Sequence, residues 1–129
     1  MKYIFLVLLL VSSLFSFEWS DDYDGAFEIA KKEHKNVYVM VGTANCPYCT
    51  KMKEITLSDE EVINKLKKDY VYIYLSRDID DIPNQFAMPF SPAHYFLDEN
   101  KEIIYSTAGY KNKKTFFKIL KEIKDSSEL

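Results

Sequence analysis

The sequence predicts an α/β fold of three layers, a central mixed β-sheet flanked by helices. Apolar runs of strand length alternate with amphipathic segments of helix length, and one Cys-x-x-Cys motif follows the first apolar run. The chain has 129 residues, enough for one compact domain. Hydrophobic residues form 47% of it, while Gly (3) and Pro (4) are scarce, which argues against disorder.

The first residues have the pattern of an export signal. Lys2 precedes an apolar run from Ile4 to Val11, and small residues follow up to Ser16. The run is shorter than the ~20 apolar residues that span a bilayer. We therefore expect a signal peptide over residues 1–16, a domain over residues 17–129, and an exported or periplasmic protein that is soluble after signal removal.

A helix and a strand come next. Between Ser20 and Lys35, apolar residues recur with the spacing of one buried helix stripe. The run from Val37 to Val41 is β-branched and aromatic without polar alternation, which predicts a central strand buried on both faces. The helix stripe consists of Tyr23, Ala26, Phe27 and Ala30.

The cysteine motif opens a second helical region. A short turn over residues 42–45 brings Cys46 to the helix start, where Pro47 fits because a first-turn N–H has no partner within the helix. Ser58 and Glu61 have the spacing of a capping box, so we expect the region to continue to about Lys68.

The second half of the chain predicts a strand, a loop, a hairpin and a closing helix. Residues 71–75 read as a strand parallel to the first, because a helical crossover separates the two. The acidic segment from Ser76 to Ser91 is expected to be a solvated loop with a helix N-cap, since a calcium loop would need a Gly and a terminal Glu that it lacks. Residues 93–97 and 102–106 flank a short turn as two hairpin strands. After Gly109, a helix with Phe116, Ile119, Leu120 and Ile123 on one face ends the fold.

The two cysteines of the chain are the candidate catalytic residues. A cysteine at a helix N-terminus is stabilised as a thiolate, so Cys46 is the expected nucleophile. Cys49 lies one turn behind it and can attack a mixed disulfide formed at Cys46. Cys49 is therefore the expected resolving cysteine.

The two thiols could instead form a structural disulfide or bind a metal ion. A structural bridge of this span adds little stability, and a zinc site needs two further ligands when His34 and His94 are the only histidines. We expect His34 to be a surface residue and His94 to be packed or hydrogen-bonded. Copper(I) remains an alternative, since thiolates and thioethers are soft ligands and Met40, Met52 and Met88 are available, although these methionines also fit core positions.

Together, the element order, the motif Cys46-Pro47-Tyr48-Cys49 and the segment from Ser91 to Asp98 resemble the thioredoxin-like superfamily, particularly its secreted bacterial members. The likeness covers essentially the whole mature chain. It implies that Pro92, rather than Pro89, is the cis-proline that faces the active site. A cis bond there would expose the backbone of Ser91 for pairing with an extended substrate.

Three features depart from the family pattern. Met40 stands where thioredoxins commonly carry a buried acid that helps to deprotonate the second cysteine, so Cys49 needs water or another base. Asn45 replaces the Trp usual before the motif and removes part of a substrate platform. The Pro47-Tyr48 dipeptide is that of glutaredoxins, without a further signature of a glutathione site.

These observations predict an exported thiol:disulfide oxidoreductase with Pro47, Tyr48, Ser91 and Pro92 contacting substrate. Its cofactor is expected to be its own cysteine pair, its partners exported protein thiols and disulfides and a membrane electron donor, and its state monomeric. The net charge of -3 does not favour nucleic-acid binding. Reduction is the expected direction. The alternatives are a dithiol oxidase, a copper(I)-binding or chaperone-like module, and a subunit dedicated to one partner.

Overall fold

The computed structural model describes residues 22–128 and has the predicted α/β architecture. One mixed sheet holds the strands in the order β2-β1-β3-β4. The second strand runs parallel to the first. The third strand pairs antiparallel with the first and forms an antiparallel hairpin with the fourth. The expected signal over residues 1–16 and the first residues of the expected domain lie outside the described part. The strands are β1 (Asn36–Gly42), β2 (Tyr70–Ser76), β3 (Ala93–Leu97) and β4 (Ile103–Ala108).

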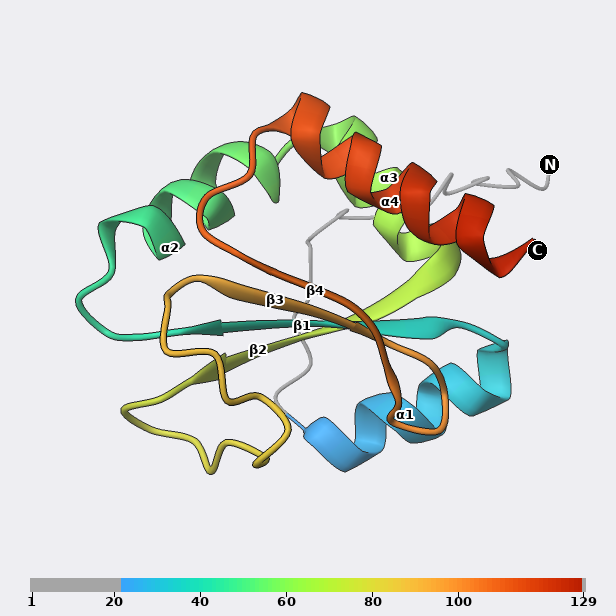
Figure 1. The fold of residues 1–129 in the computed structure, drawn as a ribbon, viewed down its shortest axis with the longest axis horizontal. Coiled ribbons are helices and arrows are strands. Elements are labelled where there is room, and N and C mark those ends of the chain that lie inside the picture. The colour runs from blue at the N-terminus through green and yellow to red at the C-terminus, as the bar shows by residue number, and fades with distance from the viewer. Residues whose placement is uncertain (1–21, 129) are drawn as a thin grey trace, which may run out of the picture.

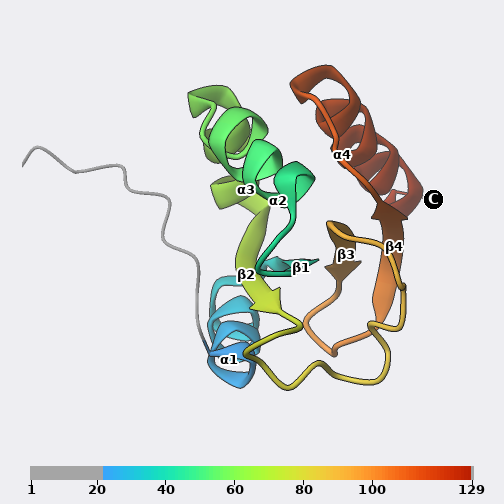
Figure 2. The same cartoon turned by 90° about the vertical axis from the view of Figure 1, so that its left-hand side faces the viewer.

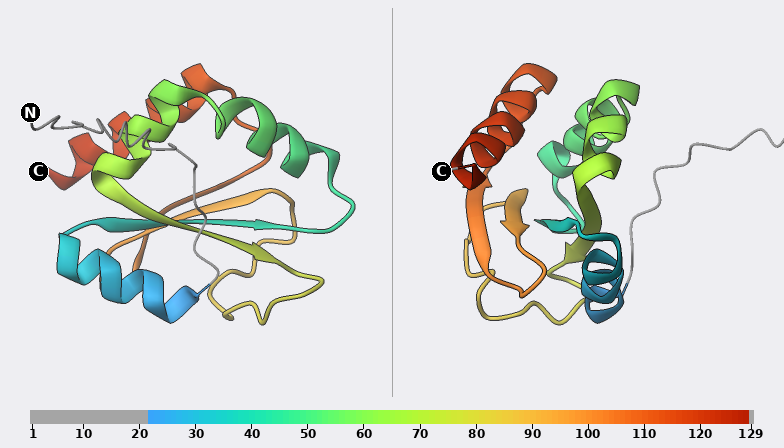
Figure 3. Two further views of the ribbon diagram at one scale, coloured as in Figure 1. Left: turned by 180° about the vertical axis from the view of Figure 1, so that it is seen from behind. Right: turned by 90° about the vertical axis from the view of Figure 1, so that its right-hand side faces the viewer.

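Helices cover both faces of the sheet, which gives three layers (Figures 1 and 3). One face packs against α1 (Tyr23–Glu33), and the loop that follows β2 lies on the same side (Figure 2). The opposite face packs against the remaining helices, which are α2 (Pro47–Lys51), the π-helix η1 (Met52–Thr56), α3 (Glu60–Asp69) and α4 (Lys113–Ser127). Within residues 22–128, no helix combines the length and the apolar character that crossing a membrane requires.

The side chains of the strands alternate between two cores. Because successive residues of a strand point to opposite faces, β1 sends Tyr38 and Met40 to one side and its valines to the other. We call the first side, which packs against α2 and α4, the cysteine face, because Cys49 belongs to its core. The other side, which packs against α1, is the aliphatic face. Val37 to Val41 are all fully buried, which confirms the prediction of a strand covered on both sides.

The cap of α3 corrects one expectation. Asp59, not Ser58, is the N-cap, and its Oδ1 accepts the N–H groups of Glu61 and Val62 at 3.0 and 3.2 Å. Ser58 Oγ instead donates to the carbonyl oxygens of Glu54 and Ile55. The π-helix extends the preceding helical region to Thr56, so the extended backbone needed at a cap first becomes available at Asp59.

The acidic loop corrects a second expectation. No helix begins between residues 77 and 92, so the aspartates there cap none. Asp80 instead accepts the backbone N–H of Ser76 at 2.8 Å, and Asp78 accepts an N–H from the loop before Cys46. The acidic side chains therefore hold backbone in place, Asp80 through a local bond and Asp78 through a bond to a loop 34 residues away.

Candidate active site

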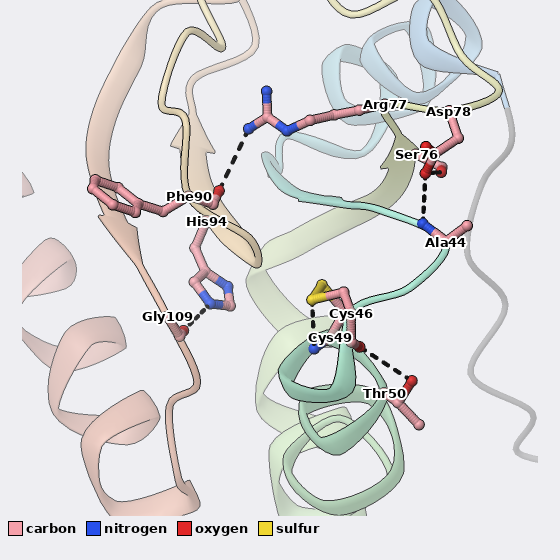
Figure 4. The surroundings of a disulfide bond; sticks show 10 residues. All are labelled: Ala44, Cys46, Cys49, Thr50, Ser76, Arg77, Asp78, Phe90, His94 and Gly109. Carbon is pink, nitrogen blue, oxygen red and sulfur yellow. Dashed lines mark hydrogen bonds between the residues drawn. A yellow bond between two sulfur atoms is a disulfide. The ribbon is translucent and has the colours of Figure 1, made fainter.

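The two cysteines are joined as a disulfide at the start of α2, with a Cα–Cα distance of 5.2 Å. Cys46 is the N-cap, and its Sγ accepts the backbone N–H of Cys49 at 3.1 Å (Figure 4). Pro47 occupies the first helical turn and Tyr48 is 61% exposed. Cys49 is only 3% exposed, whereas Cys46 is partly exposed. A protein partner therefore reaches the pair through Cys46.

Residues at the end of β2 hold the loop that carries Cys46. The Ala44 N–H donates to Asp78 Oδ2 at 2.5 Å (Figure 4). The Arg77 N–H donates to the carbonyl of Gly42 at 2.9 Å. No local sequence pattern predicted these roles for Arg77 or Asp78. The available signal was their place at the carboxyl end of a strand parallel to β1, because such ends meet at one edge of a sheet.

The segment before β3 lies at the same edge. The Ser91–Pro92 peptide bond is cis in the structure. Val41 pairs with Ala93 in the antiparallel register, so Pro92 lies beside Gly42, at the base of the loop that leads to the cysteines. The Gly109 N–H donates to the Pro92 carbonyl at 2.8 Å.

A guanidinium group supports the chain just before Ser91. Arg77 Nη2 donates to the carbonyl oxygen of Phe90 (Figure 4) and to that of Met88. Its Nε is buried without a hydrogen-bond partner among the described residues. Arg77 thus connects the cysteine loop, through its backbone, with the segment leading to Ser91, through its side chain.

His94 is buried and hydrogen-bonded, as predicted. Its Nε2 lies 2.8 Å from the carbonyl of Gly109 (Figure 4), which can only accept, so Nε2 carries the proton. Nδ1 therefore accepts from the Tyr38 hydroxyl at 2.6 Å. Burial is the main cause that lowers the pKa of His94 to about 4, and the charge of Lys111 adds to it. The neutral imidazole is a structural link between β1, β3 and the chain at Gly109. His34 is exposed at the C-cap of α1.

Met40 lies fully buried in the same core as Cys49. In the sheet it pairs with Tyr74 on β2 and with His94 on β3. The side chains next to Met40 in the sheet are therefore a phenol and a neutral imidazole, and Met40 itself offers no carboxylate to Cys49.

The candidate copper(I) ligands lie on opposite faces of the sheet. Met40 and Met52 are buried on the cysteine face with Cys49, while Met88 packs against the core of the aliphatic face. Among residues 22–128, no group of three or more His, Cys, Asp or Glu side chains is placed to hold a metal ion.

The thioredoxin-like domain model matches residues 23–124, almost all of the described fold. The chain belongs to the thioredoxin-like domain family. A thioredoxin from Thermus thermophilus superposes with a TM-score of 0.67 at 24% identity, over 85% of this chain and 86% of that one. The oxidised C-terminal domain of DsbD from Neisseria meningitidis gives a TM-score of 0.66 at 13% identity, over 81% and 98% of the two chains. At these identities the likenesses establish the thioredoxin-like fold.

A curated relative shares part of the thioredoxin-like domain. Human spermatogenesis-associated protein 20 is 32% identical over 66 residues, which are 48% of this chain and 8% of the human protein. The chain thus matches only a small part of that relative's length.

Proposed function

We propose that this chain is a thiol:disulfide oxidoreductase that exchanges its Cys46–Cys49 disulfide with the thiols and disulfides of exported proteins. One observation carries the proposal: the partly exposed Cys46 Sγ accepts the Cys49 N–H, while Cys49 is buried behind it. A hydrogen bond from an N–H stabilises a thiolate more than a thiol. The geometry therefore favours Cys46 as the attacking sulfur in the reduced protein.

The reaction divides between the two cysteines. The Cys46 thiolate attacks one sulfur of a partner disulfide, which forms a mixed disulfide and releases the other partner sulfur as a thiolate. Cys49 then loses its proton and attacks Cys46 Sγ. The intramolecular disulfide forms, and the partner leaves with both of its sulfurs reduced.

Partner binding is proposed to use the exposed surface around Cys46. Pro47 and Tyr48 project from the first turn of α2, and Ser91 and Pro92 lie at the sheet edge beside Gly42. The backbone of Ser91 is the proposed pairing partner for an extended polypeptide. The 64% exposed Phe90 just before it supports contact with apolar partner side chains.

Reduction is the proposed direction, with electrons supplied by a membrane donor. Tyr48 places no cation between the cysteines, so the Cys46 thiolate lacks the stabilisation that makes a disulfide strongly oxidising. Met40 acts in the opposite direction, because without a carboxylate the thiolate escapes a like-charge penalty. The Pro47-Tyr48 dipeptide lies nearer the sulfurs than Met40 does, so we expect its effect on the reduction potential to be the larger one. We expect a potential between roughly -270 and -180 mV, and equilibration with glutathione buffers measures it.

Export is proposed from the sequence of residues 1–16. The signal is proposed to be removed near Ser16, which would leave the thioredoxin-like domain as a monomer in an oxidising compartment. Mass spectrometry of the protein from fractionated cells tests this, and an intact N-terminus on cytoplasmic protein would contradict it.

Reduction of insulin with dithiothreitol tests the activity. Wild type should accelerate it, and Cys46→Ser should abolish the acceleration because the attacking sulfur is gone. Cys49→Ser should instead accumulate mixed disulfides, visible on non-reducing gels. Full activity in Cys46→Ser would refute the assigned roles.

A further inference from the structure

A buried glycine brings a phenol to the resolving cysteine. A Cβ atom added to Gly42 would lie 2.6 Å from the Tyr74 hydroxyl oxygen and 3.1 Å from Cys49 Sγ. Both atoms therefore border the same small space above the Gly42 Cα, which any other residue would fill. Because Gly42 has no side chain, the phenol and the sulfur face each other across this space.

A lysine lies against the same phenol. Lys53 belongs to η1, one turn beyond Cys49, and its Nζ lies 3.1 Å from the centroid of the Tyr74 ring. An ammonium group over an aromatic face is attracted to it, which fixes both side chains. Burial lowers the pKa of Lys53.

From these contacts we propose that Tyr74 and Lys53 stabilise the thiolate of Cys49 while it releases a bound partner. This role rests on the proposed oxidoreductase function. Met40 offers no carboxylate to the resolving cysteine, so these two side chains take the place of that missing group. Tyr74 acts as a hydrogen-bond donor and Lys53 as a positive charge, so both favour the charged form of Cys49.

Burial, with help from two nearby carboxylates, keeps Tyr74 protonated. Burial first, and then the carboxylates of Asp78 and Asp80, raise the pKa of Tyr74 above its usual 10.0. Among residues 22–128, the titratable groups that face the phenol include Lys53 from η1 and these two aspartates from the loop after β2, with the neutral His94 on the far side of Met40. A phenol that stays protonated can donate to a thiolate but cannot take up its proton.

The step balances without a further reactant. In the mixed disulfide, the Cys49 thiol releases its proton to water, and the thiolate receives the Tyr74 hydrogen bond. The thiolate attacks Cys46 Sγ, the Cys46–Cys49 bond forms, and the bond from Cys46 to the partner sulfur breaks. The partner sulfur leaves with the electron pair as a thiolate.

Tyr74→Phe is the decisive variant, because it removes the hydroxyl and keeps the ring under Lys53. In a Cys46→Ser background, where Cys49 is the remaining thiol, the pH dependence of its alkylation should shift upward by about one pKa unit. With Cys46 present, mixed disulfides at neutral pH should resolve about threefold more slowly, since a tenfold smaller thiolate fraction is partly offset by greater nucleophilicity.

Lys53→Met, which keeps an apolar stem but removes the charge, should shift the pKa of Cys49 in the same direction. Tyr110→Phe is the matched control, because Lys51 Nζ lies 4.4 Å from the centroid of the Tyr110 ring in a similar pair. That control should leave the pKa of Cys49 unchanged. An unshifted pKa in both Tyr74→Phe and Lys53→Met, or an equal shift in the control, overturns the inference. Since alkylation needs no partner protein, inactivity of the wild type toward insulin would refute the proposed function separately.

Discussion

The two faces of the sheet are made by the same strands but differ in chemistry. The cysteine face carries side chains with hydroxyl, imidazole or sulfur groups, whereas the aliphatic face is filled mainly by branched hydrocarbons. From the strands, the first face holds Tyr38, Met40, Tyr70, Tyr72, Tyr74, His94 and Phe96, and the second holds Val37, Val39, Val41, Ile73, Leu75, Tyr95 and Leu97. Polar groups are thus concentrated in the layer beneath the disulfide, while the layer against α1 serves packing.

The largest expected effect is a loss of stability, without a loss of activity, from a substitution on the aliphatic face. Ile73→Ala on the aliphatic face should lower the free energy of unfolding by about 2–5 kcal/mol, because Ile73 is fully buried and leaves a cavity. The rate of disulfide exchange by the folded protein should not change. Urea denaturation and insulin reduction measure the two quantities. A slower exchange by folded Ile73→Ala would show that the faces are coupled.

Met40→Leu on the cysteine face is the control for this comparison. Leucine conserves most of the buried volume, so the free energy of unfolding should fall by less than about 1.5 kcal/mol. A loss as large as that of Ile73→Ala would mean that the cysteine face depends on close packing to the same degree.

The second expected effect is a pH dependence specific to the cysteine face. The pKa of His94 falls to about 4 in the folded protein from 6.5, so between these values the unfolded chain binds a proton that the native protein does not. Stability should therefore fall as the pH drops from about 6.5 to about 4, by up to about 3 kcal/mol. Denaturation series at several pH values measure it.

His94→Gln isolates this contribution. Glutamine does not titrate, so the difference in unfolding free energy between wild type and variant should shrink as the pH falls through this window. The charges of Lys111 and of the other ionisable groups are common to both proteins and cancel in that difference. A difference that stays constant with pH would contradict the assignment of the neutral imidazole.

Most of the fold follows from local patterns. Residues 93–97 form the predicted strand, and the cysteine motif caps a helix because a Pro after Cys46 suits a first turn. The alternation of side chains between the two faces of a strand depends only on neighbouring residues, so the structure keeps it. The cap of α3 was displaced by one residue, because Ser58 and Asp59 both have capping side chains and the π-helix before them decides between the two.

The supporting contacts of the site could not be predicted in this way. Asp78 binds the Ala44 N–H across 34 residues, and Tyr38 binds His94 across 56. Each bond depends on strand register, which brings distant residues together only after the sheet has formed. Sequence patterns identify the reactive cysteines by their spacing, whereas the groups that tune them are found through the register of β1, β2 and β3.

The smallest expected effect compares one hydroxyl on each face. Tyr38 on the cysteine face and Tyr95 on the aliphatic face are both nearly fully buried, with exposed fractions of 0% and 2%. The Tyr38 hydroxyl donates to His94 Nδ1, whereas the Tyr95 hydroxyl accepts from the N–H of the half-buried Met88 at 3.1 Å. Each Phe variant keeps the ring and removes one hydrogen bond.

Tyr38→Phe should lower the free energy of unfolding by about 1–3 kcal/mol, because it leaves an imidazole nitrogen buried without a donor. Tyr95→Phe should lower it by about 0.5–1.5 kcal/mol, since the Met88 N–H lies in a surface loop where water can replace the hydroxyl. Urea denaturation at pH 7.5, where His94 is neutral in both states, measures both losses. Equal losses would mean that the hydroxyl on the cysteine face is no more constrained by buried partners than its counterpart, and that the polar layer is not a connected network.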